Sequence, residues 1–141
     1  MQIDSQAKAN RLSWWGVLKL DWDHLQRLRG TESVKLTLFK CFSSRFFHVF
    51  LIRSCLHLAQ CGYKRTAKLL SAFLVMLYKI EVGLECKIEG GLVIPHPCGI
   101  VIGSRYIGED VIIFQNVTLG AKYPAFRYKA GDRPSIGSRV I

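Results

Sequence analysis

The sequence predicts an α+β fold in which an N-terminal helical region leads into a parallel β-solenoid. Apolar residues recur at helical spacing up to about residue 80, and aliphatic residues then recur at every sixth position. A six-residue period is typical of solenoids in which each hexapeptide forms one short strand and a turn. We therefore expect a helical domain over residues 1–80 and a solenoid domain over residues 81–141.

Three helices are predicted in the N-terminal region. Ser13 is suited to cap the first helix, which Gly30 ends, and the other two cover residues 43–60 and 64–78. The segment 31–42 is ambiguous, because "VKLTLF" alternates like a strand but lies between helices. The tryptophans Trp14, Trp15 and Trp22 suit either the core or an interface between subunits.

Two series of aliphatic residues, offset by one position, carry the six-residue period. They are Val82, Ile88, Ile94 and Ile100, followed by Val101, Ile107, Ile113 and Leu119. Each is expected to point into a narrow core, with a small residue or a turn after it. Glycine directly follows the aliphatic residue at Val82, Ile107, Leu119 and Ile136.

The six-residue pattern is interrupted between Leu119 and Ile136. This stretch includes Lys122 and Arg133 and predicts a loop, residues 121–135, that protrudes from the solenoid. Insertions of this kind commonly hold functional residues, although a plain solvated insertion is the alternative. No capping unit follows Ile141, which predicts a solenoid truncated at its C-terminus.

The chain carries 20 Lys and Arg against 10 Asp and Glu, a formal net charge of +10. This excess favours an anionic partner, but no nucleic-acid-binding motif is present, so a phosphate-bearing small molecule is expected instead.

Apolar stretches at residues 46–52 and 69–78 are shorter than the roughly 20 residues that cross a bilayer. Cations beside them, including Arg45, Arg53 and Lys64, could give peripheral contact with a membrane, with two packed helices as the favoured alternative.

The five cysteines lack paired spacing, which indicates a reducing compartment rather than a disulfide framework. No CxxC pair occurs, so no metal site is expected. The polar N-terminus lacks the apolar segment of a signal peptide. We therefore expect a cytoplasmic protein, at most at the inner face of the membrane.

Three stretches, "IPHPCGIVIG", "IIFQNVTLGA" and "GDRPSIG", carry a specific resemblance to a known family. From about Glu81 onward the chain resembles the left-handed parallel β-helix of hexapeptide acyltransferases. Within them it is similar to the serine acetyltransferases and their relatives among surface-polysaccharide enzymes, and "LKLDWDHLQRLRG" is similar to the helical part of that branch. The resemblance implies acetyl-CoA as co-substrate and no metal.

The resemblance implies transfer of an acetyl group to a hydroxyl, with His96 as the base that removes the hydroxyl proton. Glu81 lies fifteen residues before His96, where the family carries an aspartate that orients the histidine. A packed core histidine and a solvated glutamate are the alternatives. Cys98, two residues after His96, could form an acyl-enzyme, but the family transfers the acetyl group directly.

Two further groups of residues match family positions. Gly120 and Ala121, with Lys122 beside them, match the region near the CoA thiol, where backbone amides can stabilise an oxyanion. Asp132 and Arg133 match the loop that binds the acceptor, and an arginine there could pair with a carboxylate.

Two departures from the serine-specific pattern concern the acceptor. Pro95 stands where those enzymes carry an aspartate that binds the serine amino group, and Pro134 follows Arg133 where they carry a histidine. A sugar hydroxyl of a surface polysaccharide is therefore expected, with L-serine as the alternative and a truncated non-catalytic paralogue as a further one. The resemblance also implies a homotrimer or a pair of trimers, with active sites between neighbouring subunits.

Overall fold

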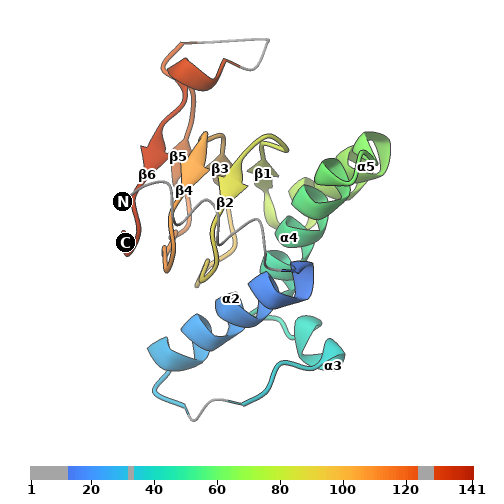
Figure 1. The fold of residues 1–141 in the computed structure, drawn as a ribbon, viewed down its shortest axis with the longest axis vertical. Helices are drawn as coiled ribbons and strands as arrows, with labels where there is room; N and C mark the ends of the chain where they lie inside the picture. The colour runs from blue at the N-terminus through green and yellow to red at the C-terminus, as the bar shows by residue number, and fades with distance from the viewer. Residues whose placement is uncertain (1–12, 32–33, 124–128) are drawn as a thin grey trace.

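The computed structural model describes residues 13–31, 34–123 and 129–141, so residues 124–128 of the predicted loop lie outside the described residues. In the view of Figure 1 the successive coils run from β1 (Ile80–Val82), beside α4 (Phe47–Gln60) and α5 (Lys64–Tyr78), to β6 (Ser135–Ile136) at the far end. Helix α2 (Trp14–Leu28) and the short α3 (Leu38–Cys41) lie below the strands, and the short helix η1 (Ala130–Asp132), between β5 (Thr118–Leu119) and β6, lies above them (Figure 1). Within the described ranges, no helix combines the length and apolar character needed to span a membrane.

The helical region consists of α2 (Trp14–Leu28), α3 (Leu38–Cys41), α4 (Phe47–Gln60) and α5 (Lys64–Tyr78). Ser13 caps α2 as predicted, because its hydroxyl oxygen accepts a hydrogen bond from the amide of Gly16 at 3.1 Å. Helix α5 has the predicted bounds, whereas α4 begins later than predicted because residues 43–46 form turns. The ambiguous segment 31–42 contains α3 and, among its described residues, no strand.

The strands form two parallel sheets. One holds β1 (Ile80–Val82), β3 (Ile100–Ile102) and β5 (Thr118–Leu119); the other holds β2 (Lys87–Ile88), β4 (Tyr106–Ile107) and β6 (Ser135–Ile136). An isolated parallel bridge between Val93 and Ile112 marks a third side of the coil. The coarse prediction of a helical region followed by parallel coils is therefore confirmed.

Strand β3 corrects one detail of the predicted core. Ile100 and Ile102 are both fully buried, and Val101 between them is only half-buried. Side chains alternate between the two faces of a strand, so Val101 cannot point inward together with Ile100. The second inward series therefore begins at Ile102, whose following residue is Gly103.

The helices and the coils share one hydrophobic core. Ile52 of α4 and Leu74 of α5 belong to the same buried cluster as Ile80 and Ile100, and the predicted boundary after residue 80 falls inside β1. Trp22 is 6% exposed and donates through Nε1 to the carbonyl oxygen of Val34 at 2.6 Å.

Trp14 and Trp15 pack, partly buried, against the smaller core cluster that also contains Trp22. The tryptophans therefore belong to the core of the chain.

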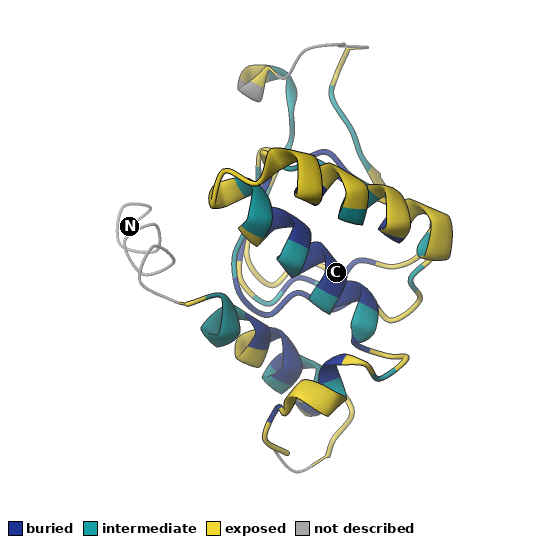
Figure 2. Ribbon diagram, turned by 90° about the vertical axis from the view of Figure 1, so that its right-hand side faces the viewer, coloured by how far each residue is buried: buried dark blue, intermediate teal, exposed yellow. Residues whose placement is uncertain are grey.

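Helix α5 exposes most of its apolar residues. It buries Ala67 and Leu74, while Leu69, Phe73 and Met76 are exposed. The outward side of α5 is accordingly coloured as exposed along nearly its whole length (Figure 2). The apolar stretch 69–78 is thus only partly buried inside the chain.

Candidate functional site

His96 lies at the corner of the coil just before β3, and its side chain is exposed. The alternative of a packed core histidine is therefore wrong. Its ring lies over Phe114 of the next coil, with the ring centroids 6.5 Å apart. Pro95 and Cys98 beside it are also exposed, and the Cys98 amide donates to the His96 carbonyl oxygen at 2.9 Å. Phe114 is a contact that sequence reasoning missed: it lies within the quoted stretch "IIFQNVTLGA", but nothing in the sequence assigns it a role of its own.

His96 differs from the other three histidines in its hydrogen bonding. His24 and His48 contact backbone carbonyl oxygens through Nδ1 and Nε2, at 2.6 and 2.9 Å, and His57 Nε2 lies 3.7 Å from a cysteine sulfur. Among the described residues, no hydrogen bond engages a ring nitrogen of His96. Its imidazole is therefore open to a ligand.

Glu81 lies in the middle of β1, where it pairs with Val101 of β3, and its side chain is exposed. The described residues include no hydrogen bond between Glu81 and His96. The structure thus places Glu81 on an outer face of the coil without joining it directly to the imidazole.

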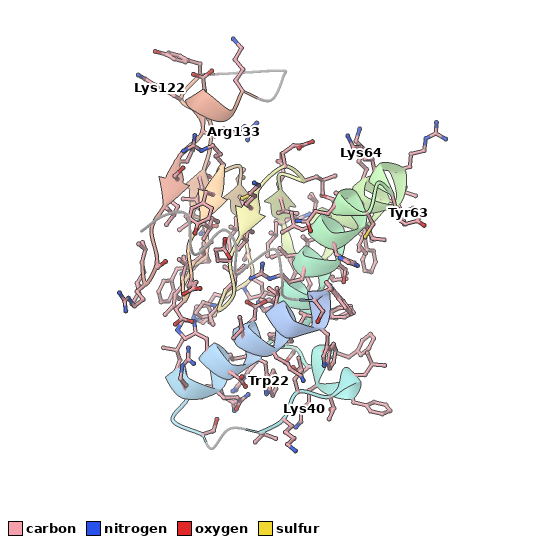
Figure 3. All side chains as sticks on the ribbon, viewed as in Figure 1. Trp22, Lys40, Tyr63, Lys64, Lys122 and Arg133 are labelled. Atoms are coloured by element: carbon pink, nitrogen blue, oxygen red, sulfur yellow. The ribbon has the colours of Figure 1, made fainter. Side chains whose placement is uncertain are left out.

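The remaining predicted site residues lie at a second corner of the coil, beyond the ends of β3 and β5. We call it the loop corner, and it holds Gly120, Ala121, Lys122, Asp132 and Arg133. Arg133 donates through Nη1 to the Gly103 carbonyl oxygen at 2.6 Å, and the Lys122 amide donates to the Asp132 carbonyl oxygen at 2.7 Å. These bonds fasten the base of the loop to the coil. The side chains of Lys122 and Arg133 lie at this end of the molecule, far from Trp22 (Figure 3).

This loop corner is suited to an anionic ligand. Lys122, Lys129 and Arg105 are exposed and Arg133 is half-buried, with Asp132 as the carboxylate beside them. Cations grouped in this way attract phosphate groups. In the part of the chain that the structure describes, no group of three or more His, Cys, Asp or Glu residues could hold a metal ion.

The backbone at the loop corner also leaves donors open. Among the described residues, the amides of Gly120 and Ala121 make no backbone hydrogen bond, unlike that of Lys122. A Cβ placed on Gly120 would meet only Thr118 Cγ2, at 3.4 Å, so a ligand could approach this backbone closely.

The His96 corner and the loop corner lie at opposite ends of β3. With about 3.3 Å per residue, β3 and its flanking residues keep them on the order of 10 Å apart. The structure therefore brings Gly120, Ala121 and Lys122 together with Asp132 and Arg133, and separates them within one chain from His96 and the adjacent Pro95.

The described geometry can be compared with known proteins. No protein-family model matches the chain. It is 36% identical over 92 residues to the serine acetyltransferase of Helicobacter pylori, an alignment that covers 62% of this chain and 52% of that relative. The serine acetyltransferase of Neisseria gonorrhoeae, solved in complex with serine, matches 99% of this chain and 55% of its own at a TM-score of 0.70 and 19% identity. The chain is similar to serine acetyltransferases.

A second solved structure extends the match. The serine acetyltransferase 1 of Entamoeba histolytica, in complex with L-cysteine, matches 86% of this chain and 47% of its own, at a TM-score of 0.60 and 26% identity. The chain spans about half the length of the relatives it matches.

The chain also contains a buried polar network that links the helices to the segment before His96. The Asp21 carboxylate accepts from Arg53 Nε and Nη2, both at 2.8 Å, and from the amides of Gly91 and Leu92, also at 2.8 Å. Asp21 is 0% exposed and Arg53 is 5% exposed. Burial raises the pKa of Asp21, and its four donor contacts oppose that shift by favouring the carboxylate.

Arg53 continues this network toward the first coil. It donates to the carbonyl oxygens of Ile88 and Glu89, both at 2.6 Å. The sequence-based idea that Arg53 could meet a membrane surface is therefore wrong, because the guanidinium is buried and paired. Arg45 and Lys64, the other cations named for that contact, are exposed.

His24 and His48 hold two more carbonyl oxygens of the same segment. His24 Nδ1 lies 2.6 Å from the oxygen of Gly91, and His48 Nε2 lies 2.9 Å from that of Ile94. Burial lowers the pKa of His48 to about 4, so its ring is neutral and donates through Nε2. We call Asp21, His24, His48 and Arg53 the anchor residues. Sequence reasoning missed their role because residues on separate helices show no pattern that names a backbone partner.

Proposed function

We propose that this chain is part of an acetyl-CoA-dependent O-acetyltransferase with His96 as its general base, and that its coils wind left-handed as the resemblance implies. One observation carries the proposal: His96 is exposed, and among the described residues its ring nitrogens are not engaged, whereas the other three histidines are. The similarity to serine acetyltransferases supports the reaction class.

The proposed step is direct transfer. His96 takes the proton of the acceptor hydroxyl while its oxygen attacks the thioester carbonyl of acetyl-CoA. The C–S bond then breaks, which releases CoA thiolate, and the protonated imidazole returns the proton to the sulfur. Glu81 would stabilise the imidazolium, and the open amides of Gly120 and Ala121 would donate to the oxyanion of the tetrahedral intermediate.

We propose L-serine as the acceptor. The relatives named above are all serine acetyltransferases, and one of them was solved with serine, so they favour L-serine over the expected sugar hydroxyl. Arg133 could pair with the serine carboxylate, and Asp132 supplies a carboxylate beside it at the loop corner. The exposed cations Lys122 and Lys129 would attract the anionic acetyl-CoA toward the loop corner.

We further propose a cytoplasmic homotrimer, alone or as a pair of trimers, with each site formed between two copies. Two observations support this assembly. His96 and Arg133 lie at opposite ends of β3 within one chain, and a site between two copies would let the two residues come from different chains. The exposed apolar residues Leu69, Phe73 and Met76 of α5 offer a surface that a second copy could cover.

Release of the CoA thiol tests this function. We expect release with L-serine and acetyl-CoA, no release with nucleotide sugars, and a loss of at least a hundredfold in kcat for His96→Ala. The Cys61→Ala variant, with an exposed residue distant in sequence from both corners, serves as the control. A folded protein that releases no thiol with any acceptor would contradict the proposed function. Release that is unchanged in His96→Ala would contradict the role of His96.

A further inference from the structure

Six backbone groups of the first coil have helix side chains as hydrogen-bond partners. They are the carbonyl oxygens of Ile88, Glu89, Gly91 and Ile94 and the amides of Gly91 and Leu92. On the other side, this coil bonds to the second coil in the ordinary way, for example from the Ile113 amide to the Val93 carbonyl oxygen at 2.9 Å. No coil precedes the first one within the described residues, so its outer backbone N–H and C=O groups would otherwise lack hydrogen-bond partners. The side chains of the anchor residues supply those partners in place of a preceding coil.

The anchored segment ends immediately before the proposed base. Ile94, whose carbonyl oxygen His48 holds, is separated from His96 only by Pro95. The proline ring fixes its own backbone φ and restricts the residue before it. The position of residues 88–94 therefore sets the direction in which the chain presents the imidazole of His96.

We propose that Asp21 and Arg53 are positioning residues for His96, holding the backbone of residues 88–92 so that the imidazole keeps its place before β3. The inference rests on the proposed function of His96 as a base. Asp21 and Arg53 carry the largest share of the anchoring, because they supply four of the six backbone contacts and pair with each other through two hydrogen bonds. A shift of about 1 Å in a reacting group can cost about a hundredfold in rate.

The Asp21→Asn variant tests this role. The amide keeps one oxygen to accept from the Gly91 and Leu92 amides but removes the charge that pairs with Arg53. We expect kcat to fall about tenfold or more, with KM for acetyl-CoA within about twofold, because the loop corner is untouched. The matched control is Arg27→Gln, which breaks the Arg27–Asp110 ion pair between the same helix and the coils, 3.1 Å long and exposed. Its kcat should stay within about twofold of the wild type.

Nuclear magnetic resonance gives a second readout that does not depend on activity. In Asp21→Asn, the amides of Gly91 and Leu92 should exchange faster with solvent, and the ring signals of His96 should move. In Arg27→Gln, the ring signals of His96 should stay unchanged. If Asp21→Asn does not fold, the double variant Asp21→Asn/Arg53→Gln replaces it, because removing both charges leaves neither one unpaired in the interior.

The outcomes separate the two proposals. A folded variant with unchanged kcat and unchanged His96 ring signals would overturn the positioning role. If the wild-type chain transfers no acetyl group, the proposed function fails, and the His96 ring signals alone decide whether Asp21 and Arg53 position this residue.

Discussion

The imidazole of His96 lies over the ring of Phe114, with the centroids 6.5 Å apart and the ring planes inclined by 34°. The two residues come from successive coils, and Phe114 is 43% exposed, so the ring pair is at the surface. Aromatic pairs contribute about 0.5–1.5 kcal/mol beyond the area they bury. Phe114 therefore limits the orientations that the proposed base can adopt.

The Phe114→Ala variant should lower kcat for acetyl transfer by about two- to tenfold, since the ring contact that restrains His96 is lost. Steady-state CoA release measures the effect. Phe39→Ala removes a ring of α3 that is 91% exposed and should leave kcat unchanged. An equal kcat in wild type and folded Phe114→Ala would show that the ring pair does not restrain the base.

Gly103 lies where β3, β5 and the base of the loop meet. A Cβ at this position would lie 2.9 Å from the Leu119 carbonyl oxygen and 3.0 Å from Arg133 Nη1. We expect Gly103→Ala to lower the free energy of unfolding by about 1–3 kcal/mol. The Leu119 carbonyl oxygen belongs to the backbone of β5, which cannot easily move away from the added methyl group. Urea unfolding measures the loss.

Gly137→Ala is the matched control, because a Cβ there would meet nothing within 4 Å. Its free energy of unfolding should match or slightly exceed that of the wild type, since alanine restricts the unfolded chain. Equal stability of the two variants would mean that the crowding at Gly103 is relieved without cost.

Local patterns predicted the elements of this fold well. Ser13 caps α2 and α5 has its predicted bounds, because caps and helical periodicity act within a few residues of sequence. The six-residue period located the coils, but it misplaced Val101, because two inward residues two positions apart, Ile100 and Ile102, obscure the register of the repeat.

The anchoring of the first coil could not be predicted from the sequence. Arg53 looked like a cation beside an apolar helix, yet it is buried against Asp21, 32 positions earlier in the chain. The reason lies in tertiary structure. The positions at which the first coil needs hydrogen-bond donors and acceptors exist only once that coil has folded. The motif around His96 located the proposed base, but the sequence alone could not show that Arg133 lies at the opposite end of β3.

Pro95 offers a test of the acceptor. It is exposed, so a change there should not disturb the core. We expect Pro95→Asp to lower KM for L-serine by up to about tenfold, because a carboxylate beside His96 could pair with the serine amino group. KM for 3-hydroxypropanoate, which lacks that group, should not fall. Equal changes for both acceptors would indicate that position 95 does not contact the amine.

Cys98 is exposed and adjacent to the proposed base, so it tests the route of transfer. Direct transfer requires no thiol, and we expect Cys98→Ala to keep kcat within about threefold of the wild type. Mass spectrometry of protein quenched during turnover should detect no acetylated Cys98. An acetyl adduct at Cys98, with loss of activity in Cys98→Ala, would instead indicate an acyl-enzyme.

His48 links stability to pH. Its pKa in the folded chain is lowered by burial to about 4 from its ordinary value of 6.5, while its Nε2 donates to the Ile94 carbonyl oxygen. Below pH 6.5 the unfolded chain binds a proton at His48 that the folded chain excludes. Stability is therefore fully present above pH 6.5 and falls as the pH decreases toward 4.

We expect the wild type to lose about 2 kcal/mol more stability than His48→Gln when the pH falls from 7 to 5. Glutamine can still donate to the Ile94 carbonyl oxygen but does not titrate. Other titrating groups, such as Asp21 and Glu89, are common to both proteins and largely cancel in this comparison. Urea unfolding at the two pH values measures the difference. Equal losses in the two proteins would mean that the buried ring takes up its proton without unfolding, and that a local opening exposes His48 first.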